Sequence, residues 1–323
     1  MTLDRRDFLA LGAGVLAAPA MPRAALAAGE MNVVATTGMI ADTARRIGGE
    51  AVSVRALMGP GVDPHAYRQT RTDIVAMAQA DVVLWNGLYL EAQMEEVLAD
   101  IGRRTPVHAV AEEGVAKDRL IAHDDYADRF DPHVWMDPRL WRGVAEAVQA
   151  ALTGIAPDRE AEFAANAGAF LAEVDRLADY ADGILATVPE SARVLVTAHD
   201  AFNYFGRAHG FEVVGIQGIS TESEAGLNRI GQLVDLLVDR GVSAVFVESS
   251  VSDRSVRALA EGAASRGHEV RIGGELYSDA MGAPGTYEGT YIGMIDHNAT
   301  VIAAGLGGTV PPRGMDGKLS AGS

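Results

Sequence analysis

Short apolar runs alternate with amphipathic segments along most of the chain. In the first half, each apolar run is followed by residues whose hydrophobic positions recur every three or four places. The predicted strands are Val33–Thr37, Val52–Met58, Asp81–Trp85 and Val134–Met136, and the predicted helices are Gly38–Ile47, Thr72–Ala80 and Arg139–Leu152. Strands and helices that alternate in this way are typical of parallel α/β layers.

The same alternation begins again after residue 190. Here the predicted strands are Arg193–Thr197, Glu212–Ile216, Ala244–Val247 and Glu269–Ile272, and the predicted helices are Leu227–Asp239, Asp253–Ser265 and Tyr291–Ala304. A chain of 323 residues is long for a single core, and two domains are the usual solution at this length. We therefore expect two parallel-sheet α/β lobes, over residues 31–155 and 189–307.

Residues 156–188 join the two predicted lobes. Their apolar side chains, from Phe163 to Ile184, are spaced three, four or seven residues apart, which predicts one face of a helix,. At 1.5 Å per residue the helical stretch Pro157–Val188 would span roughly 48 Å, which is longer than one domain,. The spacing favours a single linking helix, and the alternative is a two-helix hairpin broken at Gly168.

Both ends of the chain differ in character from the lobes. Arg5-Arg6 precedes Phe8-Leu9 and a small apolar run that ends at Ala25-Leu26-Ala27, which is typical of a cleaved twin-arginine signal peptide over residues 1–27,. Residues 308–323, rich in proline, glycine and serine, are predicted to be a disordered tail,. The chain has no cysteine that could carry a lipid. We therefore expect a periplasmic protein that is not lipid-anchored.

The net charge of −17 comes from 27 basic and 44 acidic residues. A nucleic-acid-binding protein neutralises phosphates with a basic surface, so this balance excludes nucleic acid as a partner. The absence of cysteine also excludes disulfides and thiolate metal sites,. Any metal site must therefore be built from histidine and carboxylate side chains.

Three of the eight histidines lie in loops that follow or adjoin predicted strands. These are His65, His133 and His199. Loops at the carboxyl ends of parallel strands converge, and ligands of α/β proteins bind there. Asp279, in the loop after the predicted strand Glu269–Ile272, is the best candidate for a fourth ligand.

Aspartates accompany each of the three histidines. Asp63, Asp131 and Asp200 lie within two residues of them and could hold the second nitrogen of each ring, or could simply form turns,. Glu222 and Glu224 precede a predicted helix, where acidic residues favour a helix start,. The remaining histidines have no comparable context.

Taken together, these segments resemble the zinc- and manganese-binding solute receptors of bacterial ABC importers, in the branch with three histidines and one aspartate. The resemblance covers residues 31–306. It is carried by Gly61-Val-Asp-Pro-His65-Ala-Tyr67, Asp131-Pro-His133-Val-Trp135-Met-Asp137-Pro138, Thr197-Ala-His199-Asp200-Ala-Phe202, Gly218-Ile-Ser-Thr-Glu222-Ser-Glu224 and Ser278-Asp279.

The resemblance implies one Mn²⁺ or Zn²⁺ ion per chain in the cleft between the lobes. His65 and His133 from the first lobe and His199 and Asp279 from the second would hold it. It also implies a monomer that passes the ion to a membrane permease with its ATPase and catalyses no reaction. Dedicated zinc receptors of this family often carry a histidine-rich loop before the second ligand motif. Here the corresponding residues, 116–130, include a single histidine, His123, so the sequence does not decide between manganese and zinc as the bound ion.

Two other functions use similar residues. A secreted zinc metallohydrolase needs an open ligand position and a general base, and the chain has no His-Glu-x-x-His or Gly-x-Ser-x-Gly motif. A metal-binding adhesin or storage protein would share the same site without a transporter. Four protein ligands leave no obvious open position for a catalytic water, which favours the receptor over the hydrolase. They do not distinguish a receptor from an adhesin or storage protein.

Overall fold

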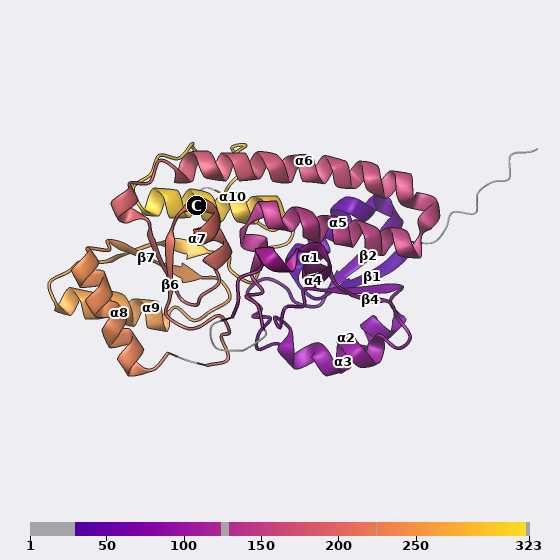
Figure 1. Ribbon diagram of the computed structural model, residues 1–323, viewed down its shortest axis with the longest axis horizontal. Coiled ribbons are helices and arrows are strands. Elements are labelled where there is room, and N and C mark those ends of the chain that lie inside the picture. The colour runs from indigo at the N-terminus through magenta and orange to yellow at the C-terminus, as the bar shows by residue number, and fades with distance from the viewer. Residues whose placement is uncertain (1–29, 124–128, 224, 321–323) are drawn as a thin grey trace, which may run out of the picture.

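The N-terminal lobe is built on one parallel four-stranded sheet. The computed structural model describes residues 30–123, 129–223 and 225–320 (Figure 1). The strand order is β2-β1-β3-β4, and every pair is parallel. The strands are β1 (Met31–Ala35), β2 (Val52–Ala56), β3 (Val82–Trp85) and β4 (Val107–Ala109). In β1 and β3 nearly every residue is buried, as expected for a parallel sheet covered on both faces,.

Five helices belong to this lobe. Two of them have clear start signals: Thr70 and Asp73 form a capping box at α2, and Asp137 accepts a hydrogen bond from the backbone N of Arg139 at α5, with Pro138 in the first position,. The helices are α1 (Gly38–Gly48), α2 (Arg71–Gln79), α3 (Glu95–Ile101), α4 (Val110–Gly114) and α5 (Pro138–Ile155).

The C-terminal lobe contains two parallel strand pairs, β5-β6 and β7-β8. β5 also lies against β7, so the two pairs form one layer. The strands are β5 (Val194–Thr197), β6 (Glu212–Gly215), β7 (Ala244–Glu248) and β8 (Arg271–Leu276). The helices are α7 (Asn203–His209), α8 (Leu227–Arg240), α9 (Arg254–Ser265) and α10 (Tyr291–Gly305).

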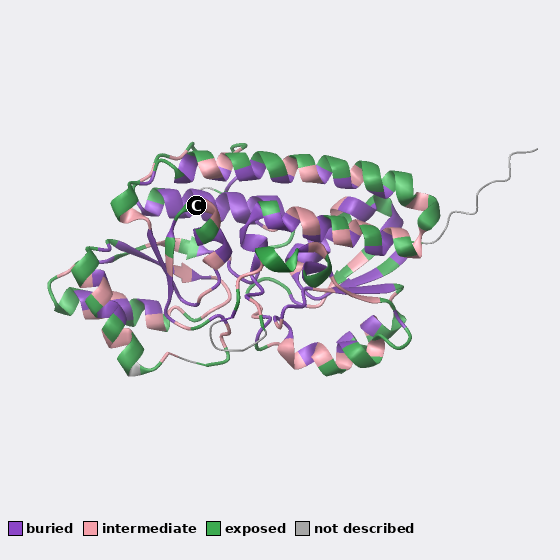
Figure 2. Cartoon of the chain, viewed as in Figure 1, coloured by how far each residue is buried: buried purple, intermediate pink, exposed green. Residues whose placement is uncertain are grey.

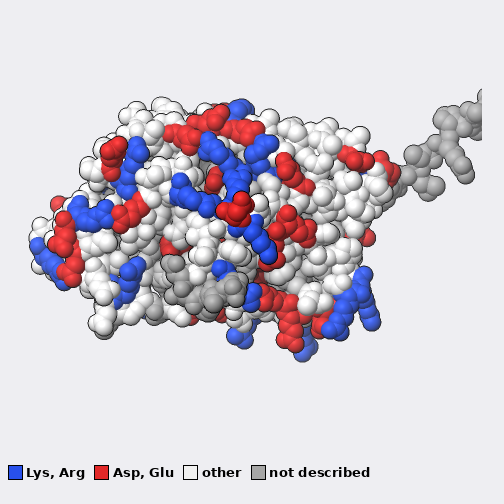
Figure 3. Space-filling view, in the orientation of Figure 1, with Lys and Arg blue, Asp and Glu red and all other residues white. Residues whose placement is uncertain are grey.

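One helix, α6 (Glu160–Leu185), connects the lobes without a break. It runs along the upper edge of the molecule in Figure 1 and contacts α1 and α5 of the first lobe and α10 of the second. Its outer face is exposed, and charged side chains of both signs lie over α5 and α6 (Figures 2 and 3). The predicted α/β class with one long linking helix is confirmed, and the hairpin broken at Gly168 is excluded.

The two lobes share one hydrophobic core. Tyr291, at the start of α10, stacks on Trp141 of α5 with ring centroids 5.0 Å apart. Its backbone N donates to Asp42 of α1, and its hydroxyl donates to the carbonyl of Trp135. The largest cluster of buried apolar side chains accordingly runs from the first sheet through α5 and α6 into α10.

Two predictions about single segments are wrong. Val134–Met136 forms a 3-10 turn instead of a strand, and its apolar side chains are buried between the lobes without pairing to a neighbouring strand. Residues 308–320, predicted to be disordered, pack against α10: Leu319 is fully buried, and Asp296 accepts a hydrogen bond from the backbone N of Met315. One buried leucine and the turn glycines Gly314 and Gly317, both with positive φ, hold the segment in place,.

The predicted signal peptide, residues 1–27, and the last three residues of the predicted tail lie outside the described residues. Over the described ranges, no helix has both the length and the apolar character needed to cross a bilayer.

Candidate metal centre

The four side chains predicted as metal ligands meet at one place between the lobes. His65 follows β2, His133 immediately precedes the 3-10 turn, His199 follows β5 and Asp279 follows β8. One ligand atom from each lies within 4.8 Å of the other three. At most 3% of any of these residues is exposed to solvent.

The ligand atoms face one another directly. The Nε2 atoms of His65 and His133 are 3.2 Å apart. Asp279 places Oδ1 3.4 Å from Nε2 of His133 and Oδ2 3.2 Å from Nε2 of His199. Three imidazole nitrogens and one carboxylate therefore surround a common point.

The ring of His133 is oriented by Asp131. Oδ1 of this carboxylate accepts from Nδ1 of His133 at 2.7 Å and from its backbone N at 2.9 Å. Asn203, on α7 of the other lobe, donates to Oδ2 of Asp131 at 3.1 Å. Because Asp131 holds a proton on Nδ1, Nε2 is the nitrogen that faces the centre of the cluster, and it offers its lone pair to a cation once it has lost its own proton.

His199 is oriented in the same way by Glu248, the last residue of β7. Its Oε2 accepts from Nδ1 of His199 at 2.5 Å, and its Oε1 accepts from the backbone N at 2.9 Å. Asp200 was the predicted partner of this ring, but Nδ1 of His199 is bonded to Glu248, and the backbone N of Asp200 donates to the carbonyl of Gly218. In the sequence, Glu248 could have been recognised as a candidate because it is an acidic residue at the end of an apolar strand.

Asp63 supports His65 through the backbone. Its Oδ1 accepts from the backbone N of His65 at 2.9 Å, and its Oδ2 accepts from the hydroxyl of Thr221 at 2.5 Å. Glu222 does not cap a helix, because α8 begins only at Leu227; instead it accepts a hydrogen bond from Gln93 at 2.6 Å. Glu224 lies outside the described residues.

The chemistry of the cluster fits a divalent cation. Nε2 of His199 and both carboxylate oxygens of Asp279 are buried and have no hydrogen-bond partner among the described residues. Burying a carboxylate is costly even with the rings of His133 and His199 beside it, and a bound cation would offset that cost,. Three neutral imidazoles and one carboxylate leave a net charge of +1 around a dication, and this mixed donor set suits both zinc and manganese.

The pKa values reflect the same environment. Burial lowers the pKa of His65 to about 3. Burial alone would also lower the pKa of His133, but the carboxylates of Asp131 and Asp279 outweigh it and raise that pKa to about 9. Burial would raise the pKa of Asp279, yet His199 and His133 hold it well below its usual range. The cluster therefore keeps Asp279 ionised and available to a cation.

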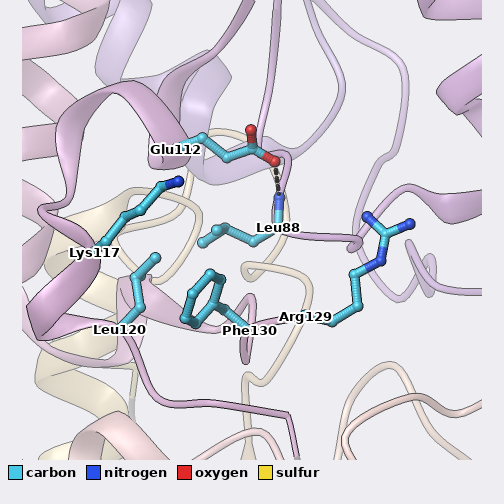
Figure 4. A pocket seen from close by; sticks show the side chains of 6 residues that line it. All are labelled: Leu88, Glu112, Lys117, Leu120, Arg129 and Phe130. Carbon is cyan, nitrogen blue, oxygen red and sulfur yellow. Dashed lines mark hydrogen bonds between the residues drawn. The ribbon is translucent and has the colours of Figure 1, made fainter. Parts of the chain in front are cut away.

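Two cavities differ in their relation to the cluster. Figure 4 shows one of about 220 Å³, where Glu112 accepts from the backbone N of Leu88 at 2.7 Å. It is lined by Leu88, Glu112, Lys117, Leu120, Arg129 and Phe130, with no predicted ligand among them. The second, of about 520 Å³, lies between α1 and the segment 279–290 and reaches Asp279. Of these two cavities, the second has one of the four clustered residues, Asp279, in its lining.

The remaining histidines lie apart from the cluster. His108 contacts Glu113 at 3.1 Å, His209 contacts Asp182 at 2.9 Å, and His268 and His297 contact backbone carbonyls. His123 is also not one of the four clustered residues.

Two parallel α/β lobes that meet on three imidazoles and a carboxylate define a two-lobe metal-binding protein. The chain belongs to the family described as zinc-uptake complex component A, periplasmic, whose model matches residues 33–305.

Relatives extend over most of the chain. It is 47% identical over 277 residues to the manganese-binding lipoprotein MntA of Bacillus subtilis, covering 86% of this chain and 90% of that one. It is 44% identical over 282 residues to the zinc-binding protein TroA of Treponema pallidum, covering 87% and 91%. The solved structure of that TroA superimposes with a TM-score of 0.84 over 86% of this chain and 99% of the other.

The predicted localisation is contradicted by relatives that are named lipoproteins. MntA of Bacillus subtilis and SloC of Streptococcus mutans, which is 28% identical, are both named lipoproteins, a class held at a membrane by a lipid. The prediction of a twin-arginine signal and of a protein without a lipid anchor is therefore corrected. It depended on residues 1–27, which lie outside the described residues, and on the lack of cysteine in the chain.

Proposed function

We propose that this chain is the substrate-binding protein of a metal ABC importer, and that His65, His133, His199 and Asp279 capture one Mn²⁺ or Zn²⁺ ion. The observation that carries the proposal is the convergence of four buried ligand atoms within 4.8 Å, two from each lobe. The relatives named for manganese and for zinc support both metals as cargo. A membrane permease with its ATPase is the proposed partner, and a monomer the proposed acting form.

We also propose that the site binds its metal ion without catalysing a reaction. A metal-dependent hydrolase needs a carboxylate that is free to take a proton from a bound water. The carboxylates of Asp131 and Glu248 beside the centre are both engaged by Nδ1 of a histidine. This arrangement supports binding and release of an ion.

Calorimetric titration of metal-free protein with Mn²⁺ and Zn²⁺ tests the proposal. We expect one ion per chain and a rise in melting temperature on loading, because the ion binds only the folded state. His65→Ala or Asp279→Ala should lower the affinity more than about 100-fold, since loss of an outer partner alone costs about 10–100-fold.

His108→Ala is the matched control, because His108 pairs with Glu113 away from the cluster. It should bind metal as the wild type does. Unchanged affinity and unchanged stabilisation in both ligand variants would refute the assignment of the centre.

A further inference from the structure

We propose that Thr221 and Glu222 form a latch that holds the lobes closed over the bound ion, with Thr221 acting on His65 through Asp63. Both latch residues lie in the connection between β6 and α8 of the C-terminal lobe. Their partners, Asp63 and Gln93, belong to the N-terminal lobe. The proposal rests on the proposed function and concerns the rate at which the ion leaves.

The first contact of the latch leads directly to a ligand. Thr221 donates its hydroxyl proton to Oδ2 of Asp63 at 2.5 Å, and Oδ1 of the same carboxylate accepts from the backbone N of His65 at 2.9 Å. Both oxygens of Asp63 are thus used, one toward each lobe. Thr221 is a positioning residue: it touches no ligand atom and acts through Asp63.

The second contact crosses the same boundary. Nε2 of Gln93 donates to Oε1 of Glu222 at 2.6 Å, joining residues 129 positions apart in the sequence. Gln93 lies in the short 3-10 segment Ala92–Met94 that precedes α3. Two adjacent residues of the C-terminal lobe, Thr221 and Glu222, are therefore hydrogen-bonded to two separate segments of the N-terminal lobe.

The position of these contacts gives them a mechanical role. The lobes are joined along one edge by α5, α6 and α10, whose side chains form the shared core. The β6–α8 connection lies along the opposite edge, below the strands in Figure 1. The latch residues belong to no helix or strand and to no hydrophobic cluster, so their hydrogen bonds can break without unpacking either lobe.

The latch has a direct consequence for the ion. The ligands come from both lobes and are at most 3% exposed, so separation of the lobes would take two of the four ligands away from the ion. Hydrogen bonds to an ionised acceptor stabilise the paired state more than those between neutral groups. Removing the Thr221 hydroxyl should therefore speed release while leaving the four ligands intact.

Thr221→Val tests this directly, since it replaces the hydroxyl by a methyl group of the same shape. In stopped-flow measurements, Mn²⁺ or Zn²⁺ would be withdrawn from the full-length loaded protein by an excess of chelator. We expect release about tenfold faster, the size expected for a lost hydrogen bond to a charged group. The association rate and the melting temperature of the metal-free protein should not change.

Two further variants separate positioning from a general structural effect. Thr221→Ser should restore the wild-type release rate, because it restores the hydroxyl. Ser265→Ala is the control: the hydroxyl of Ser265 donates to the carbonyl of Gly262 within α9, away from the latch, and its loss should leave release unchanged. Gln93→Ala removes the second contact and should also speed release.

The outcomes are distinguishable. If the wild type binds metal but Thr221→Val and Gln93→Ala release it at the wild-type rate, the latch is wrong and the metal centre stands. Faster release that Thr221→Ser fails to restore would also reject the latch. If the wild type binds neither ion, the proposed function fails, and the latch with it.

Discussion

Glu248 orients His199, one of the four proposed metal ligands, without being a proposed ligand itself. It bonds to both Nδ1 and the backbone N of His199, and it is 4% exposed. Glu248→Gln keeps the size of the side chain and removes its charge. We expect metal affinity to fall about 10–100-fold, because partners of this kind raise the basicity of the ligand and hold its ring.

Equilibrium titration of the Glu248→Gln protein provides the measurement. Glu275→Gln, a substitution of an exposed carboxylate on β8, is the control and should bind as the wild type does. An unchanged affinity in Glu248→Gln would show that the ring of His199 is held by packing alone.

Glu91 is a buried carboxylate that the metal centre does not use. Thr36 and the backbone N atoms of Asn86 and Gly87 donate to it at 2.6, 2.8 and 3.2 Å. Burial nevertheless raises its pKa from an ordinary 4.5 to about 7. Between these two pH values the folded state holds a proton that the unfolded state has released.

The stability of the metal-free protein should therefore depend on pH through this residue. Because the folded pKa is raised, the contribution of Glu91 is greatest below pH 4.5 and is lost as the pH rises toward about 7,. The loss is up to about 3 kcal/mol. Urea denaturation between pH 5 and pH 8 should show that Glu91→Gln gains stability relative to the wild type as the pH rises. A difference that does not vary with pH would contradict the assignment.

At the scale of residues, the convergence of the four candidate ligands could be predicted from the sequence, and the residues that orient them could be predicted only in part. His65, His133, His199 and Asp279 follow or adjoin elements that periodicity reveals, and parallel topology brings such loops together. Asp131 lies two residues from its histidine and was visible as a candidate. Glu248 lies 49 residues from His199, and the contact exists only because β5 lies against β7.

Among the elements, α6 and α5 use glycine in opposite ways. Gly168 is an exposed interior residue of α6, and a Cβ added there would meet nothing within 4 Å. A Cβ added at Gly143 of α5 would lie 2.0 Å from the carbonyl oxygen of Gly114, where α4 ends against α5. The first position tolerates a side chain, and the second permits the close approach of two helices.

These two glycines give a paired prediction. Gly168→Ala should stabilise the protein by about 0.5–1 kcal/mol, because alanine loses less conformational entropy in a helix. Gly143→Ala should destabilise it by about 1–3 kcal/mol, because the added methyl group forces α4 and α5 apart. Thermal or urea denaturation measures both, and effects of the same sign would contradict this description of the helices.

Elements with clear periodicity were predictable, and short ones were not. The long helix and most strands follow from apolar spacing over several residues. β4 has only three residues, with His108 at its centre, so no alternation could mark it. Val134–Met136 is apolar because it is buried between lobes, and a run of three cannot distinguish that from a strand,.

For the molecule as a whole, the shared core predicts how it unfolds. The ring of Tyr291 from the second lobe is fully buried against Trp141 of the first, and its hydroxyl and backbone N bond to that lobe as well. Neither lobe can lose its structure without exposing part of the other. Scanning calorimetry of the metal-free protein should give one transition with equal calorimetric and van't Hoff enthalpies. Two resolved transitions would contradict this.

Tyr291 also limits how the protein can be redesigned. A chimera that joins the first lobe to the second lobe of a relative would replace the partner of Trp141, and with it the bonds to Asp42 and Trp135. A graft that aims only to exchange His199 and Asp279 for other ligands must therefore carry a compatible aromatic residue at the start of α10. Changes of cargo by recombination are consequently easier through single ligand residues than through whole halves.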